Sequence, residues 1–244
     1  MPAVEEHYAQ HLAAFYDWLC GGFEAAVERN RHLLRRLAPA SPPGASALDL
    51  GAGSGHQSIP LAESGYAVTA VDSCAELLTV LEGKKGDLPI QAVRADILAH
   101  LERETETFDL ILCMGDTLTH LPDQDAARTL LTQAARLLKP GGVLLLSFRD
   151  YASSTPEGLS RFIPVRSDDT RVATCFLEYG TTHVQVHDLL HTRQEDGQWT
   201  FSASVYPKCR LAPEAVRAAL AGLGFRDVRT ESERGMVFLR AEKA

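Results

Sequence analysis

Residues 48–55 read Leu48-Asp49-Leu50-Gly51-Ala52-Gly53-Ser54-Gly55, an apolar run carrying an acid that then breaks into Gly-x-Gly-x-Gly. A segment of helical character follows, so the stretch predicts a strand, a tight turn and a helix. Glycines permit backbone angles closed to other residues and leave out side chains that would block a close ligand. The amides that begin the next helix offer hydrogen-bond donors. The arrangement is typical of a site for a nucleotide-type ligand.

The spacing of the glycines argues against a dinucleotide. The dinucleotide fingerprint is G-x-G-x-x-G or G-x-G-x-x-A. Here His56 occupies the position that should be Gly or Ala, and the third glycine comes one position early, at Gly55. A ligand without phosphates that packs against the turn is therefore favoured over a pyrophosphate. A glycine-rich turn with no ligand is the alternative.

Length and composition suit one α/β domain with a modest insertion, because the chain has 244 residues and 45% of them are hydrophobic. We expect no membrane span and no signal peptide. The net charge of −8 disfavours binding to nucleic acid or to an anionic membrane. The five cysteines are odd in number and form no C-x-x-C pair. Reduced thiols and a cytoplasmic location are therefore expected.

Short apolar strands alternate with helices along most of the chain, which predicts parallel strand pairing through right-handed crossovers. The expected helices span residues 5–38 (with a break at Gly21-Gly22), 53–64, 75–82, 124–138 and 213–223. The expected core strands span residues 47–50, 66–71, 90–95, 108–114, 143–148, 225–231 and 236–241, with a sharp turn at Pro140-Gly141-Gly142. Strand-like segments at 172–179, 182–190 and 200–205 break this rhythm.

The pattern predicts an α/β fold with a doubly wound, mostly parallel seven-stranded sheet, an N-terminal helical cap and an antiparallel β insertion. We divide the chain into a helical cap or lid (1–40), a ligand-binding core (41–150), the insertion on the substrate side (151–210), and a C-terminal helix with the last two core strands (211–244).

The succession of motifs resembles the class I S-adenosylmethionine-dependent methyltransferases. It comprises residues 48–55, Asp72 and Asp96 at the ends of the second and third strands, and the segments 108–114 and 138–142. The resemblance covers residues 46–150, and 213–239 is similar to the family's last helix and two strands. It implies a Rossmann-like methyltransferase fold, S-adenosyl-L-methionine as methyl donor and S-adenosyl-L-homocysteine as product.

A closer resemblance is to the glycine N-methyltransferase branch. It is carried by Cys113-Met114-Gly115-Asp116-Thr117-Leu118-Thr119-His120-Leu121-Pro122-Asp123 and by Phe148-Arg149-Asp150-Tyr151. In that branch the position matching Arg149 is an arginine that grips the substrate carboxylate, and the position matching Asp116 is an asparagine. The departure at Asp116 argues against glycine itself as substrate.

Each part of the cofactor needs a different partner. Asp72 suits the ribose hydroxyls, and Asp96 with the amide of Ile97 suits adenine. Asp49 is placed to attract the ammonium of the amino-acid tail, which should lie over Gly51 and Gly53. A surface-turn role for Asp72 and a helix-capping role for Asp96 are the alternatives. The full predicted cofactor set is Asp49, Gly51, Ala52, Gly53, Gly55, Asp72, Ser73, Asp96, Ile97, Met114, Gly115 and Tyr8.

The predicted catalytic residues are Asp116, His120, Arg149 and Tyr16. Asp116 is placed to orient an ammonium or hold a hydroxyl, His120 to accept a proton, and Arg149 to clamp a carboxylate. The resemblance implies that Tyr8 or Tyr16 lies near the sulfonium. The alternatives are a backbone-bonded His120, a salt bridge from Arg149 to Asp116 or Asp150, and lid tyrosines that only pack.

The residues predict methyl transfer to a nitrogen or oxygen of a small-molecule, amino-acid-like acceptor. The alternatives are a nicotinamide-dependent oxidoreductase and a non-catalytic module that binds S-adenosylmethionine or its product. His183, His187 and His191 recur every four residues in strand-like surroundings, so a polar sheet face lining the cavity is favoured over a metal site, and no metal is predicted. Tyr206, Lys208 and Arg210 are further pocket candidates. A homo-oligomer in which one N-terminus closes another subunit's pocket is compatible with the resemblance.

Overall fold

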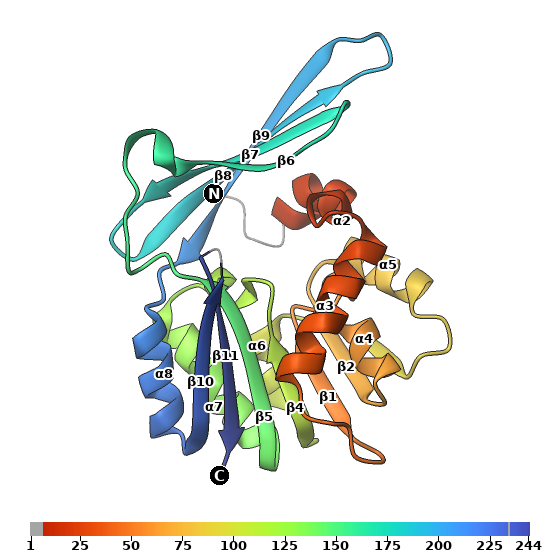
Figure 1. Cartoon of the computed structure of the whole chain (residues 1–244), viewed down its shortest axis with the longest axis vertical. Helices are drawn as coiled ribbons and strands as arrows, with labels where there is room; N and C mark the ends of the chain where they lie inside the picture. The colour runs from red at the N-terminus through yellow and green to blue at the C-terminus, as the bar shows by residue number, and fades with distance from the viewer. Residues whose placement is uncertain (1–6, 234) are drawn as a thin grey trace.

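The computed structural model of the protein describes residues 7–233 and 235–244, whose strands form two sheets (Figure 1). The larger sheet has the strand order β10-β11-β5-β4-β1-β2-β3. Its strands are β1 (Ser46–Leu50), β2 (Ala67–Asp72), β3 (Ile90–Arg94), β4 (Phe108–Cys113), β5 (Leu138–Arg149), β10 (Phe225–Glu233) and β11 (Met236–Lys243). The strands from β5 to β3 pair in parallel, and β11 runs antiparallel to both β5 and β10. The predicted fold class is confirmed.

Helices cover both faces of this sheet, and each face has its own core. The helices are α3 (Phe23–Leu37), α4 (Ser58–Glu63), α5 (Ala75–Lys84), α6 (Ile97–Arg103), α7 (Gln124–Leu137) and α8 (Pro213–Gly222). Side chains of α3, α4 and α5 join the apolar cluster on one face. Side chains of α6, α7 and α8 join the cluster on the other. Burial on both faces explains the continuous apolar run of β5, where residues 143–148 are all buried.

Two details differ from the sequence prediction. The helix α6 was foreseen only in the alternative helix-capping role of Asp96; it begins after Asp96, whose carboxylate accepts a hydrogen bond from the amide of Ala99 at 2.9 Å. The sharp turn expected at Pro140-Gly141-Gly142 lies inside β5 as an irregularity, where the register with β4 shifts. Gly141 has φ +75° there, so the strand bends at this point but continues.

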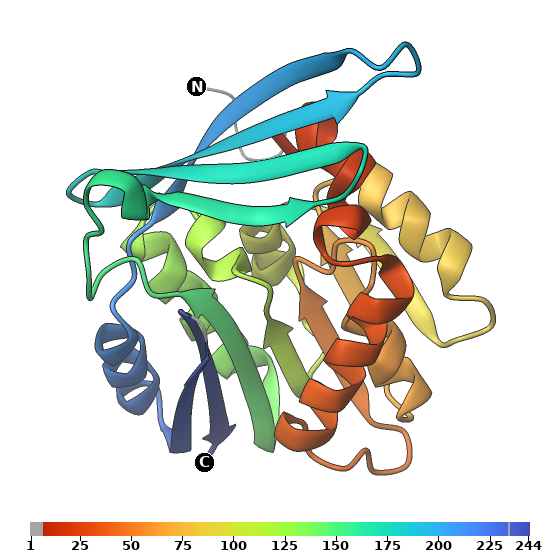
Figure 2. The ribbon, with the colours of Figure 1, turned by 45° about the horizontal axis from the view of Figure 1, so that its top comes forward.

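The insertion forms an antiparallel four-stranded sheet in the order β6-β7-β8-β9. Its strands are β6 (Phe162–Ser167), β7 (Arg171–Tyr179), β8 (His183–Arg193) and β9 (Trp199–Cys209), and a one-turn helix η4 (Gly158–Arg161) precedes them. We refer to it as the insertion sheet. The strand β6 was not predicted. Figures 1 and 2 show this sheet lying across the carboxyl-end edge of the larger sheet.

The N-terminal segment is less regular than the predicted helix. Its described part consists of η1 (Tyr8–Leu12), η2 (Ala13–Phe15) and α2 (Tyr16–Leu19), and residues 5 and 6 of the prediction lie outside the described residues. The predicted break is present, because Gly21 and Gly22 have φ of +93° and +100°. The segment lies beneath the insertion sheet (Figure 2). Among the described helices, none is long and apolar enough to cross a membrane.

Candidate functional site

The turn after β1 needs glycine for reasons that differ between positions. Gly51 has φ +77°, and a Cβ there would lie 2.4 Å from Cγ2 of Thr117. Gly55 has φ +90°, and its Cβ would lie 2.3 Å from a methyl of Leu81. A Cβ on Gly53, where φ is +54°, would instead meet the ring of Tyr16 at 3.6 Å. The first and third glycines allow close packing of the turn, and the second faces the N-terminal segment.

Asp72 ends β2 with its carboxylate against the glycine turn. Its Oδ2 accepts the amide of Gly53 and its Oδ1 accepts the amide of Cys74, both at 2.8 Å. The amides of Gly51 and Ala52 donate to the carbonyl of Val71 at 2.8 and 3.0 Å, which docks the turn on β2. The predicted ribose acid is therefore fixed beside the turn, as a group binding two vicinal hydroxyls requires.

Asp49 lies at the base of the same turn and is 1% exposed. Its Oδ2 accepts a hydrogen bond from the hydroxyl of Ser58 at 2.6 Å, which connects β1 to α4. Burial raises the pKa of Asp49 to about 6, against the lowering effect of Ser58, and Asp72 adds to the rise. A cationic group that approached this carboxylate would relieve the cost of its burial.

The predicted adenine wall is assembled from two strand ends. The carboxylate of Asp96 caps α6, so the capping alternative holds for one of its oxygens, and Ile97 begins that helix. Met114 is 3% exposed, and Gly115 (φ +72°) donates its amide to Oγ of Ser147 at 2.9 Å. Ser73, next to Asp72, accepts a hydrogen bond from Arg94 at its carbonyl. Roles of these residues in adenine binding stay predictions.

The two lid tyrosines link the turn to the opposite side of the cleft. The ring of Tyr16 stacks on His56, with centroids 5.6 Å apart and planes 9° apart. The ring centroids of Tyr8 and Tyr16 are 6.2 Å apart, and the hydroxyl oxygen of Tyr8 lies 3.4 Å from Nε2 of His120. Burial raises the pKa of both phenols, so both are protonated at neutral pH. His56, which occupies the position that breaks the dinucleotide spacing, thus supports the ring of Tyr16 by stacking.

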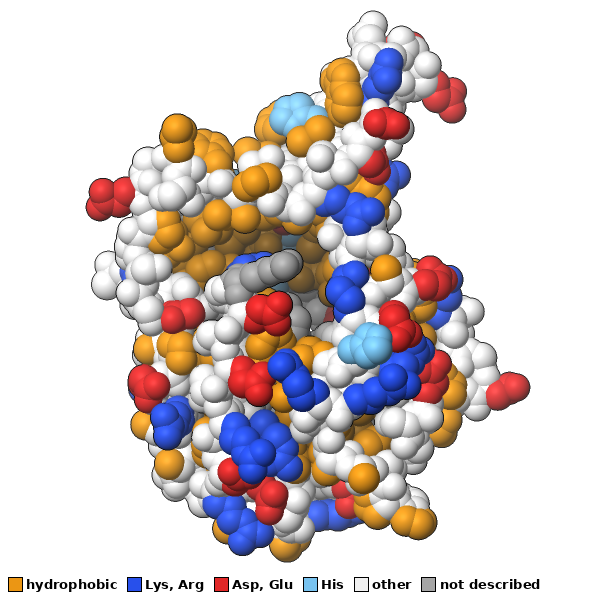
Figure 3. All heavy atoms as spheres, in the orientation of Figure 1, with side chains coloured by type: hydrophobic (Ala, Val, Ile, Leu, Met, Phe, Trp, Pro, Cys, Tyr) orange, Lys and Arg blue, Asp and Glu red, His pale blue; other side chains and the backbone are white. Residues whose placement is uncertain are grey.

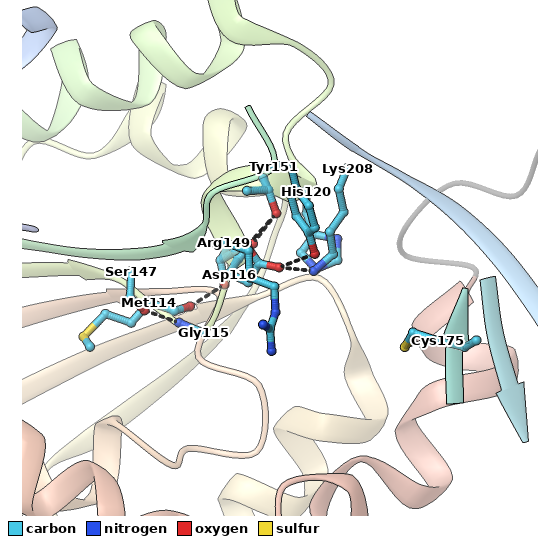
Figure 4. A network of polar contacts seen from close by, with 12 residues as sticks. Met114, Gly115, Asp116, His120, Ser147, Arg149, Tyr151, Cys175 and Lys208 are labelled. Carbon is cyan, nitrogen blue, oxygen red and sulfur yellow. Dashed lines mark hydrogen bonds and ion pairs between the residues drawn. The ribbon is translucent and has the colours of Figure 1, made fainter. Parts of the chain in front are cut away.

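Asp116 is the centre of a buried polar cluster beyond the turn (Figure 4). It has φ +76°, is 4% exposed, and forms an ion pair with Nζ of Lys208 in β9. Its Oδ1 also accepts the amide of Arg149 at 2.8 Å and the hydroxyl of Thr119 at 2.9 Å. Burial acts to raise the pKa of Asp116, but Lys208, His120 and the amide of Arg149 together bring it below its ordinary value.

His120 stacks on Tyr206 of β9, with ring centroids 5.5 Å apart. Burial and then the charge of Lys208 lower its pKa to about 3, although Asp116 opposes the shift. The ring is therefore neutral at neutral pH. Its predicted role as a proton acceptor stays a prediction, and a neutral ring that accepts a hydrogen bond agrees with this electrostatic setting.

The side chain of Arg149 does not form the internal salt bridge to Asp116 or Asp150 that was the alternative to a carboxylate clamp. Only its backbone amide contacts Asp116, and in Figure 4 its side chain points away from Asp116 and Lys208. Within the described part of the chain its guanidinium has no hydrogen-bond or ion-pair partner, and the residue is exposed. Asp150 instead accepts the amides of Ala152 and Ser153 at 3.0 and 2.9 Å. The guanidinium is left available to an anionic ligand.

His7 and Asp188 belong to the buried cluster but were not among the predicted site residues. His7 is 1% exposed; its Nδ1 lies 2.7 Å from Oγ of Ser204 and its Nε2 3.2 Å from Oδ2 of Asp188. Its ring stacks on Tyr206 at 4.0 Å. A signal was present, because Asp188 alternates with Val186 and Leu190 on the buried face of β8.

The histidines at 183, 187 and 191 face the other way. They share the outer, less buried face of β8, and His183 contacts the carbonyl of Pro122 at 2.7 Å while His187 contacts Glu178 at 3.2 Å. The expectation that they line the cavity is wrong, because the inward, buried positions of β8 are Val184, Val186, Asp188 and Leu190. No group of three metal-ligating side chains is placed to hold an ion anywhere in residues 7–233 and 235–244.

Of the other pocket candidates, Tyr206 and Lys208 join the cluster around Asp116, and Arg210 donates hydrogen bonds to the carbonyls of Tyr151 and Gly180.

A hollow separates the insertion sheet from the core, as Figure 3 shows. The glycine turn and Asp72 belong to the core side, and Tyr206 and Lys208 belong to the insertion sheet. Another groove opens at the amino ends of β1 to β4, lined by residues such as Ser46, Thr69 and His100. No predicted site residue lines that second groove.

Comparison with known proteins gives consistent matches. Residues 47–142 match the family described as a methyltransferase domain. The chain is 31% identical over 184 residues to the cypemycin N-terminal methyltransferase of a Streptomyces species, covering 69% of this chain and 72% of that protein. It is 30% identical over 202 residues to the glycine N-methyltransferase of Mus musculus, covering 72% and 68%.

A similar fold occurs in CalS10 of Micromonospora echinaspora, an amino pentose methyltransferase whose structure holds S-adenosylmethionine. The TM-score is 0.73 at 17% identity, over 90% of this chain and 92% of that one.

Proposed function

The chain belongs to the S-adenosylmethionine-dependent methyltransferases, and from this premise we propose that it methylates a small acceptor, at nitrogen or oxygen, whose anionic group is bound by Arg149. The observation that carries the proposal is the exposed guanidinium of Arg149 at the end of β5, which has no partner within the described residues. Ligands of open α/β sheets bind at the carboxyl ends of the strands. An acceptor held there would lie beside the cofactor turn.

The residues of the turn fit the cofactor. Asp72 presents a carboxylate beside three glycines, and the cationic tail can approach the buried Asp49 directly or through a water. When bound, S-adenosylmethionine supplies a methyl group already activated by a positively charged sulfur. A nitrogen or oxygen acceptor held there would take up this methyl group and would release its proton to solvent or to a neighbouring base.

The chain contributes alignment and exclusion of water. Tyr8 and Tyr16 cover the turn, and His120 and Tyr206 close the acceptor side with stacked rings. Because His120 is neutral, it can accept a hydrogen bond from an acceptor N–H or O–H and hold the lone pair in line. We keep Asp116, His120, Arg149 and Tyr16 as the residues nearest the reaction.

The charges of Asp116, Lys208 and Arg149 favour an acceptor that binds as an anion over one that binds as a zwitterion. The charge of Asp116 is already balanced by the ammonium of Lys208. An ammonium on the acceptor would therefore have to compete with Lys208 for this carboxylate. The guanidinium of Arg149 then remains as a positive charge without an ion-pair partner among the described residues. That charge attracts an anionic group, and together with Lys208 it lowers the pKa of a nearby amine, which favours its nucleophilic, unprotonated form.

The names of three similar proteins support nitrogen as the accepting atom: a glycine N-methyltransferase, a cypemycin N-terminal methyltransferase and an amino pentose methyltransferase. We further propose that the protein acts in the cytoplasm, binds no nucleic acid, and assembles as a homo-oligomer. We also propose that the lid, the core and the insertion divide between them the binding of the cofactor and the binding of the acceptor.

The test is a transfer assay with methyl-labelled S-adenosylmethionine over matched pairs of amino acids and their amides. We expect the acids to be methylated and the amides to react at least about tenfold more slowly, since a bidentate charged hydrogen bond is lost. Arg149→Gln should abolish this preference while binding S-adenosylhomocysteine as the wild-type protein does. Equal rates for acids and amides would refute the role of Arg149. Tight cofactor binding with no transfer to any acceptor would favour the non-catalytic module instead.

A further inference from the structure

The short helix α2 is held on one side by the glycine turn. Oδ1 of Asp17 accepts a hydrogen bond from the hydroxyl of Ser54 at 2.7 Å and lies 2.9 Å from Nε2 of His56. Tyr16, one residue earlier, stacks on His56 and faces Gly53. Residues 16 and 17 therefore fix the distance between the lid and the turn.

The next residue, Trp18, is held from the other side by the turn between β6 and β7. Its indole N–H donates to Oδ2 of Asp168 at 2.5 Å. The guanidinium groups of Arg166 and Arg171 each lie 5.5 Å from its ring centroid, within cation–π range. These contacts join segments 150 residues apart in the chain.

The carboxylate of Asp168 is held in place by hydrogen bonds within its own turn, independently of Trp18. Its Oδ1 accepts the amide and hydroxyl of Thr170 and the amide of Arg171, all at 2.8 Å, which closes the β6–β7 turn. These hydrogen bonds, with a further contribution from Trp18, lower the pKa of Asp168 to about 2. The carboxylate is thus ionised at any working pH, and its bond to the indole is charge-assisted.

We propose that Trp18 is a positioning residue for the cofactor, which ties the lid over the glycine turn to the insertion sheet. A helix of four residues has no stability of its own, so the orientation of α2 must come from its contacts on both sides. The insertion sheet, which supplies Lys208 and Tyr206 to the acceptor side, thereby also sets the position of Tyr16 over the cofactor turn. The proposal rests on cofactor binding at this turn and does not depend on the identity of the acceptor.

The experiment measures binding of S-adenosylhomocysteine by calorimetry to the full chain. We expect Trp18→Ala to raise the dissociation constant about tenfold, because a hydrogen bond to a charged group and two cation–π contacts are lost. Trp18→Phe keeps an aromatic ring for the two arginines but loses the N–H with the five-membered ring, and should raise the dissociation constant about threefold to fivefold. Trp199→Ala is the matched control, since Trp199 is the other tryptophan of the chain and lies in the same sheet.

A second pair of variants separates positioning from general destabilisation. Asp168→Asn weakens the contact to Trp18, and Asp196→Asn alters an equivalent turn-closing carboxylate, which accepts the amide of Gln198 at 2.9 Å in the β8–β9 turn. Asp168→Asn should lower the unfolding temperature of the ligand-free protein more than Asp196→Asn, because Asp168 accepts three hydrogen bonds within its turn and Asp196 accepts one. Only Asp168→Asn should reduce the additional stabilisation that saturating S-adenosylhomocysteine provides.

Wild-type affinity in a folded Trp18→Ala variant would overturn the proposal, and so would equal weakening by Trp199→Ala or by Asp196→Asn. These results would leave the cofactor assignment standing. Failure of the wild-type protein to bind S-adenosylhomocysteine would overturn the cofactor assignment and this proposal together.

Discussion

The two sides of the cleft are built in different ways. On the cofactor side, the contacts that shape the site join residues close in sequence: Ser58 binds Asp49 nine residues away, and Gly53 binds Asp72 across 19 residues. On the acceptor side, the Asp116–Lys208 pair spans 92 residues, and the contact of His7 with Ser204 spans 197. The glycine turn of the cofactor site is thus specified locally, although its lid is tied to the insertion sheet through Trp18 and Asp168. The acceptor site depends on docking of the insertion sheet, so its chemistry can change without altering the turn.

The largest effect is expected where the acceptor side is buried. Lys208→Met leaves the carboxylate of Asp116 buried and unpaired, so the free energy of unfolding should fall by about 3–5 kcal/mol in urea denaturation. Adding Asp116→Asn should restore much of this loss, because the uncompensated charge is removed.

The control for that prediction is Lys84→Met, which breaks an exposed pair with Glu24 and should cost less than about 1 kcal/mol. If Lys208→Met costs no more than Lys84→Met, the acceptor side is not organised around a buried ion pair, and the contrast between the two sides loses its basis.

A smaller effect is expected from crowding the cofactor turn. Gly51→Ala places a methyl group 2.4 Å from Thr117 and imposes a positive φ on a residue with a Cβ, so we expect a loss of about 2–3 kcal/mol in unfolding free energy and weaker binding of S-adenosylhomocysteine. Gly86→Ala is the control, since it has the same backbone sign (φ +54°) with no atom within 4 Å, and it should cost only about 1 kcal/mol. Equal costs would mean that Thr117 yields readily and that the turn is not closely packed.

The smallest effect is a pH dependence of cofactor binding. The pKa of Asp49 is raised to about 6 mainly by burial. A cofactor ammonium near it favours the ionised form, so bound Asp49 has a lower pKa than free Asp49 and binding releases a proton between the two values. Affinity for S-adenosylhomocysteine should therefore rise about tenfold from pH 5 to pH 7 and then level off.

In Asp49→Asn the pH dependence of binding should flatten, because the variant retains a hydrogen-bond acceptor for Ser58 and has no proton to lose. Calorimetry in buffers of different ionisation enthalpy measures the proton release directly. No proton release near pH 6 in the wild-type protein would place the ammonium elsewhere.

The position of Asp72 beside the glycine turn could be predicted from the sequence for a physical reason. Strand ends and glycines at fixed spacing determine local backbone geometry, and this places Asp72 beside the turn without knowledge of the rest of the fold. The ion pair of Asp116 with Lys208 could not be predicted, because it depends on how far β9 docks over β4. The alternative weighed for Arg149 named the right carboxylate but the wrong donor, since the amide and not the guanidinium contacts Asp116.

Two missed elements show where local patterns are weak. The strand β6 contains Pro164 and is exposed along nearly its whole length, so it has no alternation of polar and apolar residues to identify it. In β8 the prediction of cavity-lining residues followed the regular spacing of His183, His187 and His191, which lie on the outer face. The contact with His7 is made by Asp188, an acid in the inward register of an apolar series.

The most direct test of the account is a crystal structure of the protein with S-adenosylhomocysteine. We expect the ribose hydroxyls on the carboxylate of Asp72, the amino-acid tail over Gly51 and Gly53, and the sulfur beneath Tyr16, open toward Arg149 and His120. A ligand whose ribose lies away from Asp72, or whose sulfur faces away from the hollow beneath the insertion sheet, would contradict it.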